Sequence, residues 1–102
     1  MALSVVLVIR IKKNDRIGGK RLERVILDYL IEAGVSGATV WAGVDGFGKR
    51  GRSEVKIEGV SVNMPLVIEV VEERTRLEPI LGRIKQMVGS NGLVTMHDVD
   101  IL

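Results

Sequence analysis

The residues best suited to chemistry in this chain lie in one central segment, rich in glycine and in basic side chains. The segment places three glycines and three cations around the only phenylalanine of the chain, at Gly46, Phe47, Gly48, Lys49, Arg50, Gly51 and Arg52. Glycine allows a ligand to approach the main chain closely. The cations add positive charge at the same place, which suits a loop that binds an anion or a partner and is held by a rigid sheet.

A second turn, Gly89-Ser90-Asn91-Gly92, offers backbone amides in a similar way. Its glycines predict the end of a helix and a tight turn, and exposed amides in such a turn can hold an anion. Two interpretations stay open for each segment: a structural turn, with Phe47 packed on the sheet in the first segment, or a ligand site. The candidate ligand-binding residues are Gly46, Phe47, Gly48, Lys49, Gly89, Asn91 and Gly92.

The remaining basic residues are open to two interpretations as well. Arg50 and Arg52 are either solvated loop charges or contacts to a partner. A second basic stretch covers a predicted turn and helix start, with Lys12, Lys13, Arg16, Lys20, Arg21 and Arg24. Because Glu23 and Asp28 share that helix, a solvated helix face is the simpler interpretation. The formal net charge of +2 is too small to argue for nucleic acid.

The composition excludes several kinds of site. The chain has no cysteine, and its one histidine, His97, has no carboxylates at metal-ligand spacing. Paired acid–base residues and an activated nucleophile are missing too. We therefore expect no enzyme activity, no metal and no cofactor. Residues 1–11 are apolar but too short to span a bilayer, so we expect a cytoplasmic protein.

Hydrophobic periodicity divides the chain into alternating strands and helices. The predicted order is a strand at 3–11, a helix at 20–33, a strand at 38–44, a hairpin arm with Val55 and Ile57, a strand at 66–71, a helix from Thr75 and a strand at 93–102. Gly34 and Gly89 end the two helices. Thr75 and Glu78 predict a capping box, and Gly59 predicts a bulge in the arm.

Two strand–helix–strand units in succession predict an α+β fold. It is a ferredoxin-like βαββαβ sandwich over all 102 residues, with an extra hairpin arm between its halves. Its sheet has one face under the helices, and the other should be polar where it meets water. Here Val6 and Val8 lie on that other face. We expect another copy of the chain to cover it, with His97 near the boundary and Trp41 either in the core or at that boundary.

Several stretches resemble the PII-like superfamily of trimeric signalling proteins. Gly46-Phe47-Gly48-Lys49 looks like the base of the mobile T-loop of PII proteins. Pro65-Leu66-Val67-Ile68-Glu69-Val70-Val71 is similar to the strand that follows that loop, and Asn91-Gly92 lies where PII proteins carry the B-loop. The resemblance is closer still to the small family called domain of unknown function one hundred and ninety, through Gly37-Ala38-Thr39-Val40 and Gly92-Leu93-Val94-Thr95.

The resemblance implies a homotrimeric regulatory protein that senses a small anionic ligand, such as a nucleotide, in clefts between subunits. Residues 46–49 of one subunit would face residues 89–92 of its neighbour. A mobile loop at 45–64, including Arg50 and Arg52, would contact a partner such as a membrane channel or transporter. PII proteins follow the B-loop glycine with a lysine, where this chain has Leu93. We therefore expect ATP and ADP to bind weakly or not at all.

Two other classes of function stay open. An RNA-binding module of the RNA-recognition-motif type shares the strand–helix order, but it needs aromatic side chains on the central strands to stack bases. Residues 3–11 and 66–71 contain none. A small ferredoxin-fold hydrolase, such as an acyl-phosphate hydrolase, needs an Asn–Arg loop motif that the chain lacks.

Overall fold

A computed structural model describes residues 3–54 and 63–102 of the chain. Its elements follow one another as β1 (Ser4–Lys12), β2 (Arg16–Ile17), β3 (Lys20–Arg21), α1 (Leu22–Glu32), β4 (Thr39–Ala42), β5 (Asp45–Gly48), β6 (Gly51–Glu54), β7 (Pro65–Glu73), α2 (Arg74–Val88), the 3₁₀ turn η1 (Gly89–Asn91) and β8 (Leu93–Val99). Val55, Ile57 and Gly59 of the predicted hairpin arm lie outside the described residues.

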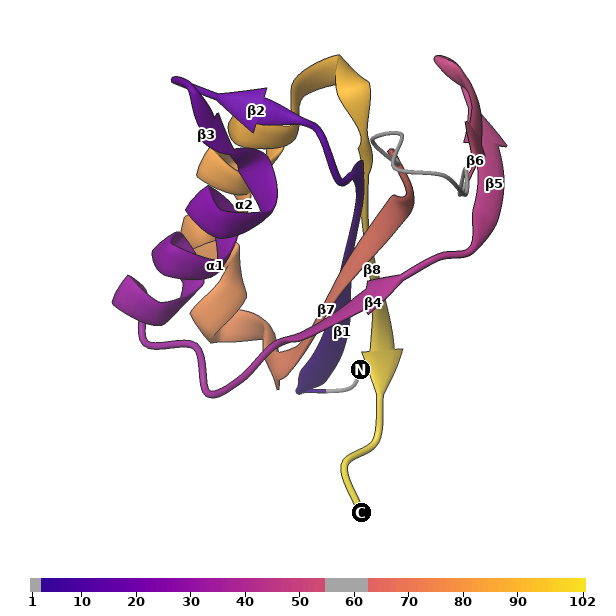
Figure 1. The fold of residues 1–102 in the computed structure, drawn as a ribbon. Coiled ribbons are helices and arrows are strands. Elements are labelled where there is room, and N and C mark those ends of the chain that lie inside the picture. The colour runs from indigo at the N-terminus through magenta and orange to yellow at the C-terminus, as the bar shows by residue number, and fades with distance from the viewer. Residues whose placement is uncertain (1–2, 55–62) are drawn as a thin grey trace.

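Four of the strands form one antiparallel sheet in the order β4-β7-β1-β8. β1 lies inside the sheet, where Val8 pairs with Glu69 of β7 on one side and with Thr95 of β8 on the other. Both helices cover one face of this sheet (Figure 1). The arrangement confirms the predicted ferredoxin-like α+β sandwich.

The hydrophobic core lies between the sheet and the two helices. β1 alternates as predicted, and Val5, Leu7 and Ile9 are fully buried on the helix-facing side. The helices contribute Leu22, Ile26, Leu30, Leu77, Ile84, Met87 and Val88 to the same cluster. Burying one such side chain is worth about 1.5–3 kcal/mol. The helical and strand periodicities therefore agree on a single two-layer core.

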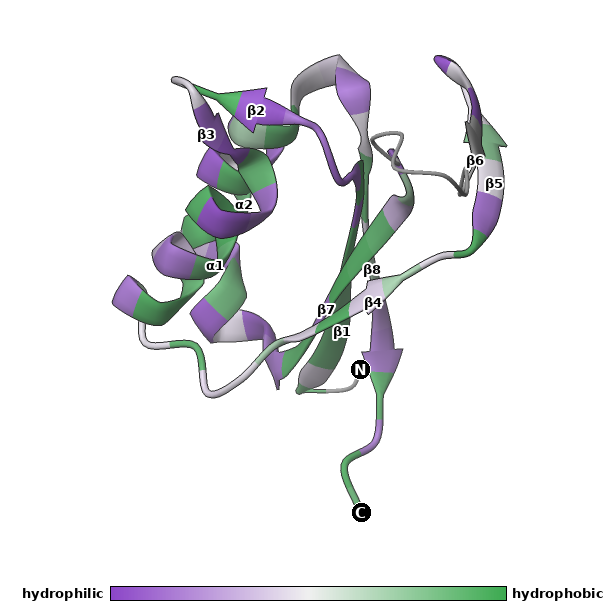
Figure 2. Cartoon of the chain, in the orientation of Figure 1, coloured by the Kyte–Doolittle hydropathy of each residue, from purple (hydrophilic) through white to green (hydrophobic). Residues whose placement is uncertain are grey.

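The opposite face of the sheet lies open in the single chain and carries apolar side chains among polar ones such as Glu69 and Thr95. Trp41, Val71 and Leu93 are 58%, 41% and 55% exposed, while Val6 and Val8 are buried. Figure 2 shows hydrophobic residues along much of β1 and β7. Trp41 therefore does not belong to the core of the single chain. An apolar patch of this kind is typical of a surface between subunits, so the covering second copy stays a prediction.

The predicted capping box at the start of the second helix is wrong. α2 begins at Arg74, its N-cap residue is Glu73, and no side chain caps it. Thr75 therefore lies inside the first turn. The physical reason is that β7 continues directly into the helix, and the Arg74 amide donates to the carbonyl of Leu3 at 2.8 Å. Leu3, just before β1, thus partners one of the first amides of α2, which have no partner within the helix.

Replacing Thr75 with alanine is expected to change stability very little. An N-cap threonine would cost about 0.5–2 kcal/mol on replacement, whereas an exposed side chain in the first turn costs no more than about 0.5 kcal/mol. Urea unfolding followed by circular dichroism measures the difference. A loss of more than about 1 kcal/mol in the free energy of unfolding would show that the Thr75 side chain does cap the helix.

Several boundaries also differ from the predicted ones: β4 is shorter than expected, and β7 is longer. α1 begins at Leu22, two residues later than expected, because the preceding β3 forms a small hairpin with β2. That hairpin turns through Gly18 and Gly19, whose φ angles are 56° and 80°, and a two-residue turn needs this conformation. The last strand ends at Val99. Among the helices of the described residues, none is long and apolar enough to cross a membrane.

Candidate functional site

The central glycine-rich segment forms a β-hairpin. The sequence predicted a mobile loop at residues 45–64, and in the described part of it the structure pairs β5 with β6 through a turn after which Gly51 has a φ of 91°. The carboxylate of Asp45 accepts hydrogen bonds from the Arg52 side chain at 2.7 and 3.2 Å and from the Gly46 amide at 2.8 Å. These bonds hold the pKa of Asp45 below its usual value, and the bond from Arg52 has the largest effect. The hairpin therefore carries its own internal polar contacts.

Phe47 projects from this hairpin into solvent. Its side chain is 90% exposed, so the structural interpretation in which Phe47 packs on the sheet is wrong. The neighbouring Val44 is 82% exposed. Folding alone does not account for two large apolar side chains left in water on one projecting hairpin. They are available to a ligand or to another protein.

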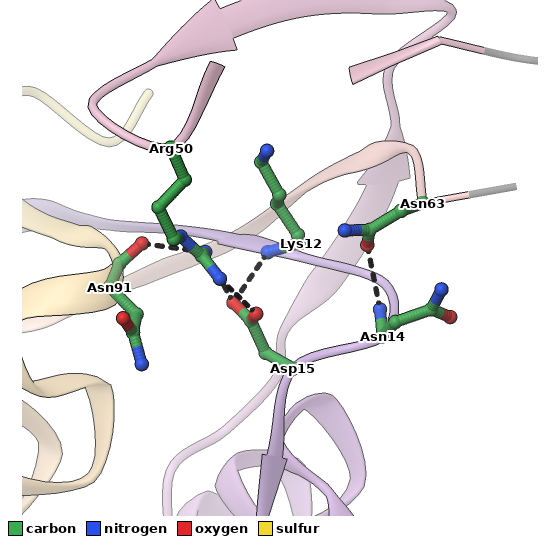
Figure 3. Close-up of polar contacts among 6 residues, drawn as sticks. All are labelled: Lys12, Asn14, Asp15, Arg50, Asn63 and Asn91. Carbon is green, nitrogen blue, oxygen red and sulfur yellow. Dashed lines mark hydrogen bonds and ion pairs between the residues drawn. The ribbon is translucent and has the colours of Figure 1, made fainter. Parts of the chain in front are cut away.

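Arg50, at the turn of the β5–β6 hairpin, joins three separate parts of the fold (Figure 3). Its Nη1 and Nη2 atoms donate to the two carboxylate oxygens of Asp15 at 2.6 and 2.9 Å. Nη2 also donates to the carbonyl oxygen of Asn91 at 2.7 Å. The guanidinium thus ties the hairpin both to the turn between β1 and β2 and to η1.

Asp15 is held firmly on the other side of this contact. Its side chain is only 8% exposed, and Oδ2 accepts the backbone amide of Lys12 at 2.9 Å. Burial raises the pKa of Asp15, but the hydrogen bonds from Arg50 and Lys12 outweigh it and leave that pKa below its usual value. Hydrogen bonding to Asp15 in turn raises the pKa of Arg50. Both groups stay charged at neutral pH.

A pocket of about 340 Å³ opens beside Arg50. Its walls come from the end of β1, the β5–β6 hairpin, the start of β7 and the η1 turn. The lining residues are Arg10, Ile11, Lys12, Phe47, Gly48, Lys49, Arg50, Pro65, Ser90, Asn91, Gly92 and Leu93. Four of these side chains are cationic, and no carboxylate is among them. The pocket is therefore suited to an anionic group.

The structure brings together most of the residues that the sequence singled out. Phe47, Gly48 and Lys49 meet Asn91 and Gly92 in this pocket. The two segments meet within one chain, whereas the resemblance placed them across a boundary between two subunits. A single chain therefore already assembles the pocket walls.

Two of the predicted ligand residues lie outside the lining. Gly46 precedes it on β5, in contact range of Pro65. Gly89 ends α2 with a φ of 60°, which is a structural task.

Sequence reasoning missed Asp15 and Pro65 as site residues, and it treated Arg50 as a solvated loop charge or a partner contact. Arg10 and Lys12 could have been predicted as site residues, because they alternate along one strand on the same face as Val6 and Val8. Cations that replace valines at the end of an apolar strand face indicate where that face stops. Asp15 carried no such signal, because its partner lies 35 residues away along the chain.

A second buried carboxylate, Glu72, belongs to the framework. It lies at the far end of β7 and accepts hydrogen bonds from the Glu73 amide at 2.9 Å and from the amide and hydroxyl of Ser36 at 3.1 Å. The bond from the Glu73 amide is the main cause that keeps the pKa of Glu72 below its usual value. Through Ser36 it ties the loop after α1 to the sheet. In the described part of the chain, no group of three or more metal-ligating side chains occurs.

Comparison with known proteins gives the family. Residues 4–101 match the model of the DUF190 family, described as "Uncharacterized ACR". A UPF0166 protein from Methanocaldococcus jannaschii is 32% identical over 101 residues, which cover 99% of this chain and 94% of the relative. A UPF0166 protein from Aquifex aeolicus is 29% identical over 91 residues, covering 88% of this chain and 85% of the relative.

Solved structures share the fold. CPII, a nitrogen regulatory PII-like protein from Thiomonas intermedia K12 solved with ADP, AMP and bicarbonate, superimposes with a TM-score of 0.76 at 20% identity. The match covers 96% of this chain and 87% of CPII. A second structure of CPII, with ADP and bicarbonate, gives a TM-score of 0.70 at 22% identity. The chain thus belongs to the DUF190 family, and its fold is that of the PII-like superfamily.

Proposed function

We propose that this protein is a PII-like regulator that binds a nucleoside mono- or diphosphate in the pocket beside the β5–β6 hairpin. The observation that carries the proposal is the concentration of four cations, Arg10, Lys12, Lys49 and Arg50, around one opening. The structural neighbour CPII was solved with ADP and AMP, which supports a ligand of this class. Regulation by this protein follows if the ligand changes how the hairpin is held.

The pocket has features that suit both ends of such a ligand. Its volume of about 340 Å³ lies at the lower end of the usual range for small-molecule pockets. Lys49 and Arg50 can contact phosphate oxygens through charge-assisted hydrogen bonds. The exposed ring of Phe47 offers an aromatic face to a base. The backbone amides of the η1 turn add donors that carry no net charge.

Leu93 affects the choice among nucleotides. It lines the pocket at the point where PII proteins carry a lysine, and its side chain is 55% exposed. Each phosphate that lacks this lysine loses a charge-assisted contact worth about 1.5–3 kcal/mol. The extra phosphate of ATP therefore gains little here. This is why the proposal names mono- and diphosphates.

Calorimetry with AMP, ADP and ATP tests the proposed ligand class. ADP or AMP is expected to bind, and Lys49→Ala is expected to weaken that binding by about one to two decades because a charged contact is lost. Leu93→Lys is expected to strengthen ATP binding. Lys85→Ala, an exposed lysine of α2 outside the pocket, serves as the matched control and should leave affinity unchanged.

Two results would count against this function. The first is that no binding heat is measured when AMP, ADP or ATP is titrated into the protein at millimolar concentration. The second is equal ADP affinity in the Lys49→Ala and Lys85→Ala variants, which would place the nucleotide elsewhere. Low-micromolar ATP binding to the unmodified protein would show that Leu93 does not weaken the site.

We further propose that three copies assemble through the open sheet face and that the β5–β6 hairpin contacts a protein partner, with a membrane channel or transporter as the working candidate. The apolar side chains on the open face support assembly. Exposed Phe47 and Arg52 on the hairpin support the partner contact. Phe47 and Arg50 belong both to the pocket lining and to the hairpin. A ligand in the pocket therefore contacts the same element as the partner and can change how the partner binds.

The two alternative functions gain no support from the structure. The open face of the central strands β1 and β7 carries valines and no aromatic side chain that could stack a base. Among the described residues, the pocket lining holds four cations and no carboxylate, so this lining offers a hydrolase no carboxylate general base.

A further inference from the structure

We propose that Asp15 is a built-in competitor of the ligand for Arg50, so that an anion entering the pocket releases the β5–β6 hairpin from the body of the protein. The proposal rests on the proposed function for the identity of the ligand. What it adds to that function is a switch, in which one edge of the Arg50 guanidinium binds either Asp15 or the ligand. Asp15 is thereby a positioning residue, because it acts through Arg50.

The geometry makes the two partners of Arg50 mutually exclusive. Asp15 occupies both Nη atoms of the guanidinium, at 2.6 and 2.9 Å. This is the bidentate edge that carboxylates and phosphates prefer. A phosphate in the pocket that takes the same edge must displace the carboxylate. The second two-bond edge of a guanidinium is Nε with Nη2, and here Nη2 also donates to the Asn91 carbonyl. A phosphate that leaves both Asp15 and Asn91 in place therefore finds no unoccupied two-bond edge on Arg50.

The two sides of the ion pair differ in how firmly they are held. The Asp15 side chain is 8% exposed and that of Arg50 is 35% exposed. The main chain of Asp15 is fixed twice, by its amide bonding the Lys12 carbonyl at 3.0 Å and by its carbonyl accepting the Leu22 amide at 2.8 Å. The second of these bonds anchors Asp15 to the start of α1. When the pair separates, Asp15 stays and the hairpin moves.

Separation also reaches η1. The Nη2 atom that bonds Asp15 also donates to the Asn91 carbonyl at 2.7 Å, and Asn91 lines the pocket. One guanidinium therefore connects the hairpin, the β1–β2 turn and the η1 turn. A ligand that reorients it affects two walls of the pocket, the hairpin and η1, together with the β1–β2 turn, which couples occupancy to the position of the hairpin.

Asp15→Asn separates this switch from a merely structural ion pair. Asparagine keeps one carbonyl oxygen for the Lys12 amide but presents one acceptor instead of two to Arg50. We expect faster hydrogen exchange in the hairpin amides around Arg50 without any ligand. We also expect ADP affinity to rise by about three- to tenfold, because the ligand no longer displaces a charged partner.

Arg50→Ala is the opposing variant. It also frees the hairpin, so hydrogen exchange should rise as in Asp15→Asn, but ADP affinity should fall because the phosphate loses its bidentate partner. An ion pair that only held the pocket together would lower the affinity in both variants. The opposite signs of the two affinity changes are therefore the diagnostic result.

Asp45→Asn provides the matched control. It breaks the other arginine–aspartate contact of the same hairpin, that of Arg52, and Asp45 does not line the pocket. ADP affinity should stay within twofold of the unmodified protein. Inorganic phosphate, titrated in parallel, should show the same order of affinities if the phosphate group alone drives the exchange of partners.

The outcomes separate this inference from the proposed function. ADP binding by the unmodified protein together with unchanged or weaker binding by Asp15→Asn would overturn the competitor role and leave the ligand class standing. Unchanged hydrogen exchange in the hairpin of Asp15→Asn would overturn it as well. Absence of ADP and phosphate binding in all four proteins would overturn the proposed function, and the competitor role with it.

Discussion

Replacing Val8 with aspartate is expected to abolish self-association of this protein. Val8 lies at the centre of the open sheet face, between Glu69 of β7 and Thr95 of β8. An unpaired charge buried at an interface costs several kcal/mol, and here the new carboxylate would also stand beside that of Glu69. Sedimentation equilibrium should show a trimer for the unmodified protein and a monomer for the variant.

A second variant distinguishes a loss of assembly from a loss of folding. Val8 is only 7% exposed in the single chain, so aspartate there also weakens the fold. Val71, on the same face, is 41% exposed, and Val71→Lys should leave the circular dichroism spectrum unchanged while it abolishes assembly. Ile31→Lys, at a 73% exposed position on α1, is the control and should stay trimeric. A stable monomer of the unmodified protein at micromolar concentration would refute the assembly altogether.

Periodicity predicted most of the fold because the core depends on it. The alternation that places Val5, Leu7 and Ile9 on one side of β1, and the stripe that places Ile26 and Leu30 on one side of α1, are local properties of the sequence. Element order then leaves few arrangements for two helices on a four-stranded sheet. The fold class could therefore be deduced without the coordinates.

Local signals failed where a long-range contact replaced them. The capping pattern of Thr75 is valid in isolation, but the carbonyl of Leu3 partners the start of α2 instead. The glycines and cations around Gly48 are typical of a loop, yet the structure pairs β5 with β6 in a hairpin and places Asp45 against Arg52. Short-range patterns cannot report a partner that the fold supplies from elsewhere.

The candidate site was predictable only in part for the same reason. Glycine-rich turns and cations indicated two segments, and the structure places both on one pocket. The ion pair between Asp15 and Arg50 joins residues that have no pattern in common. It depends on the turn after β1, the β5–β6 hairpin and η1 lying together, so that only the assembled fold shows it.

Gly92→Ala is expected to be among the most destabilising single-methyl changes in this chain. A Cβ atom at Gly92 would collide with the carbonyl oxygen of Arg10 and would lie 2.9 Å from Cγ1 of Val88 and 3.2 Å from Cγ2 of Ile11. The Arg10 carbonyl cannot yield easily, because its strand is paired on both sides. Overpacking of this kind costs about 1–3 kcal/mol and sometimes more, and we expect the upper end of that range.

Gly82→Ala is the matched control, and its effect should have the opposite sign. Gly82 lies inside α2, where an added Cβ meets nothing within 4 Å. Alanine in a helix is favoured over glycine by about 0.8–1 kcal/mol, so urea unfolding should show a higher midpoint for Gly82→Ala and a much lower one for Gly92→Ala. Because Gly92 also lines the pocket, any shift of β1 away from β8 in its variant should weaken ADP binding too. Equal stability of the two variants would mean that the close approach of Gly92 to β1 is not maintained in solution.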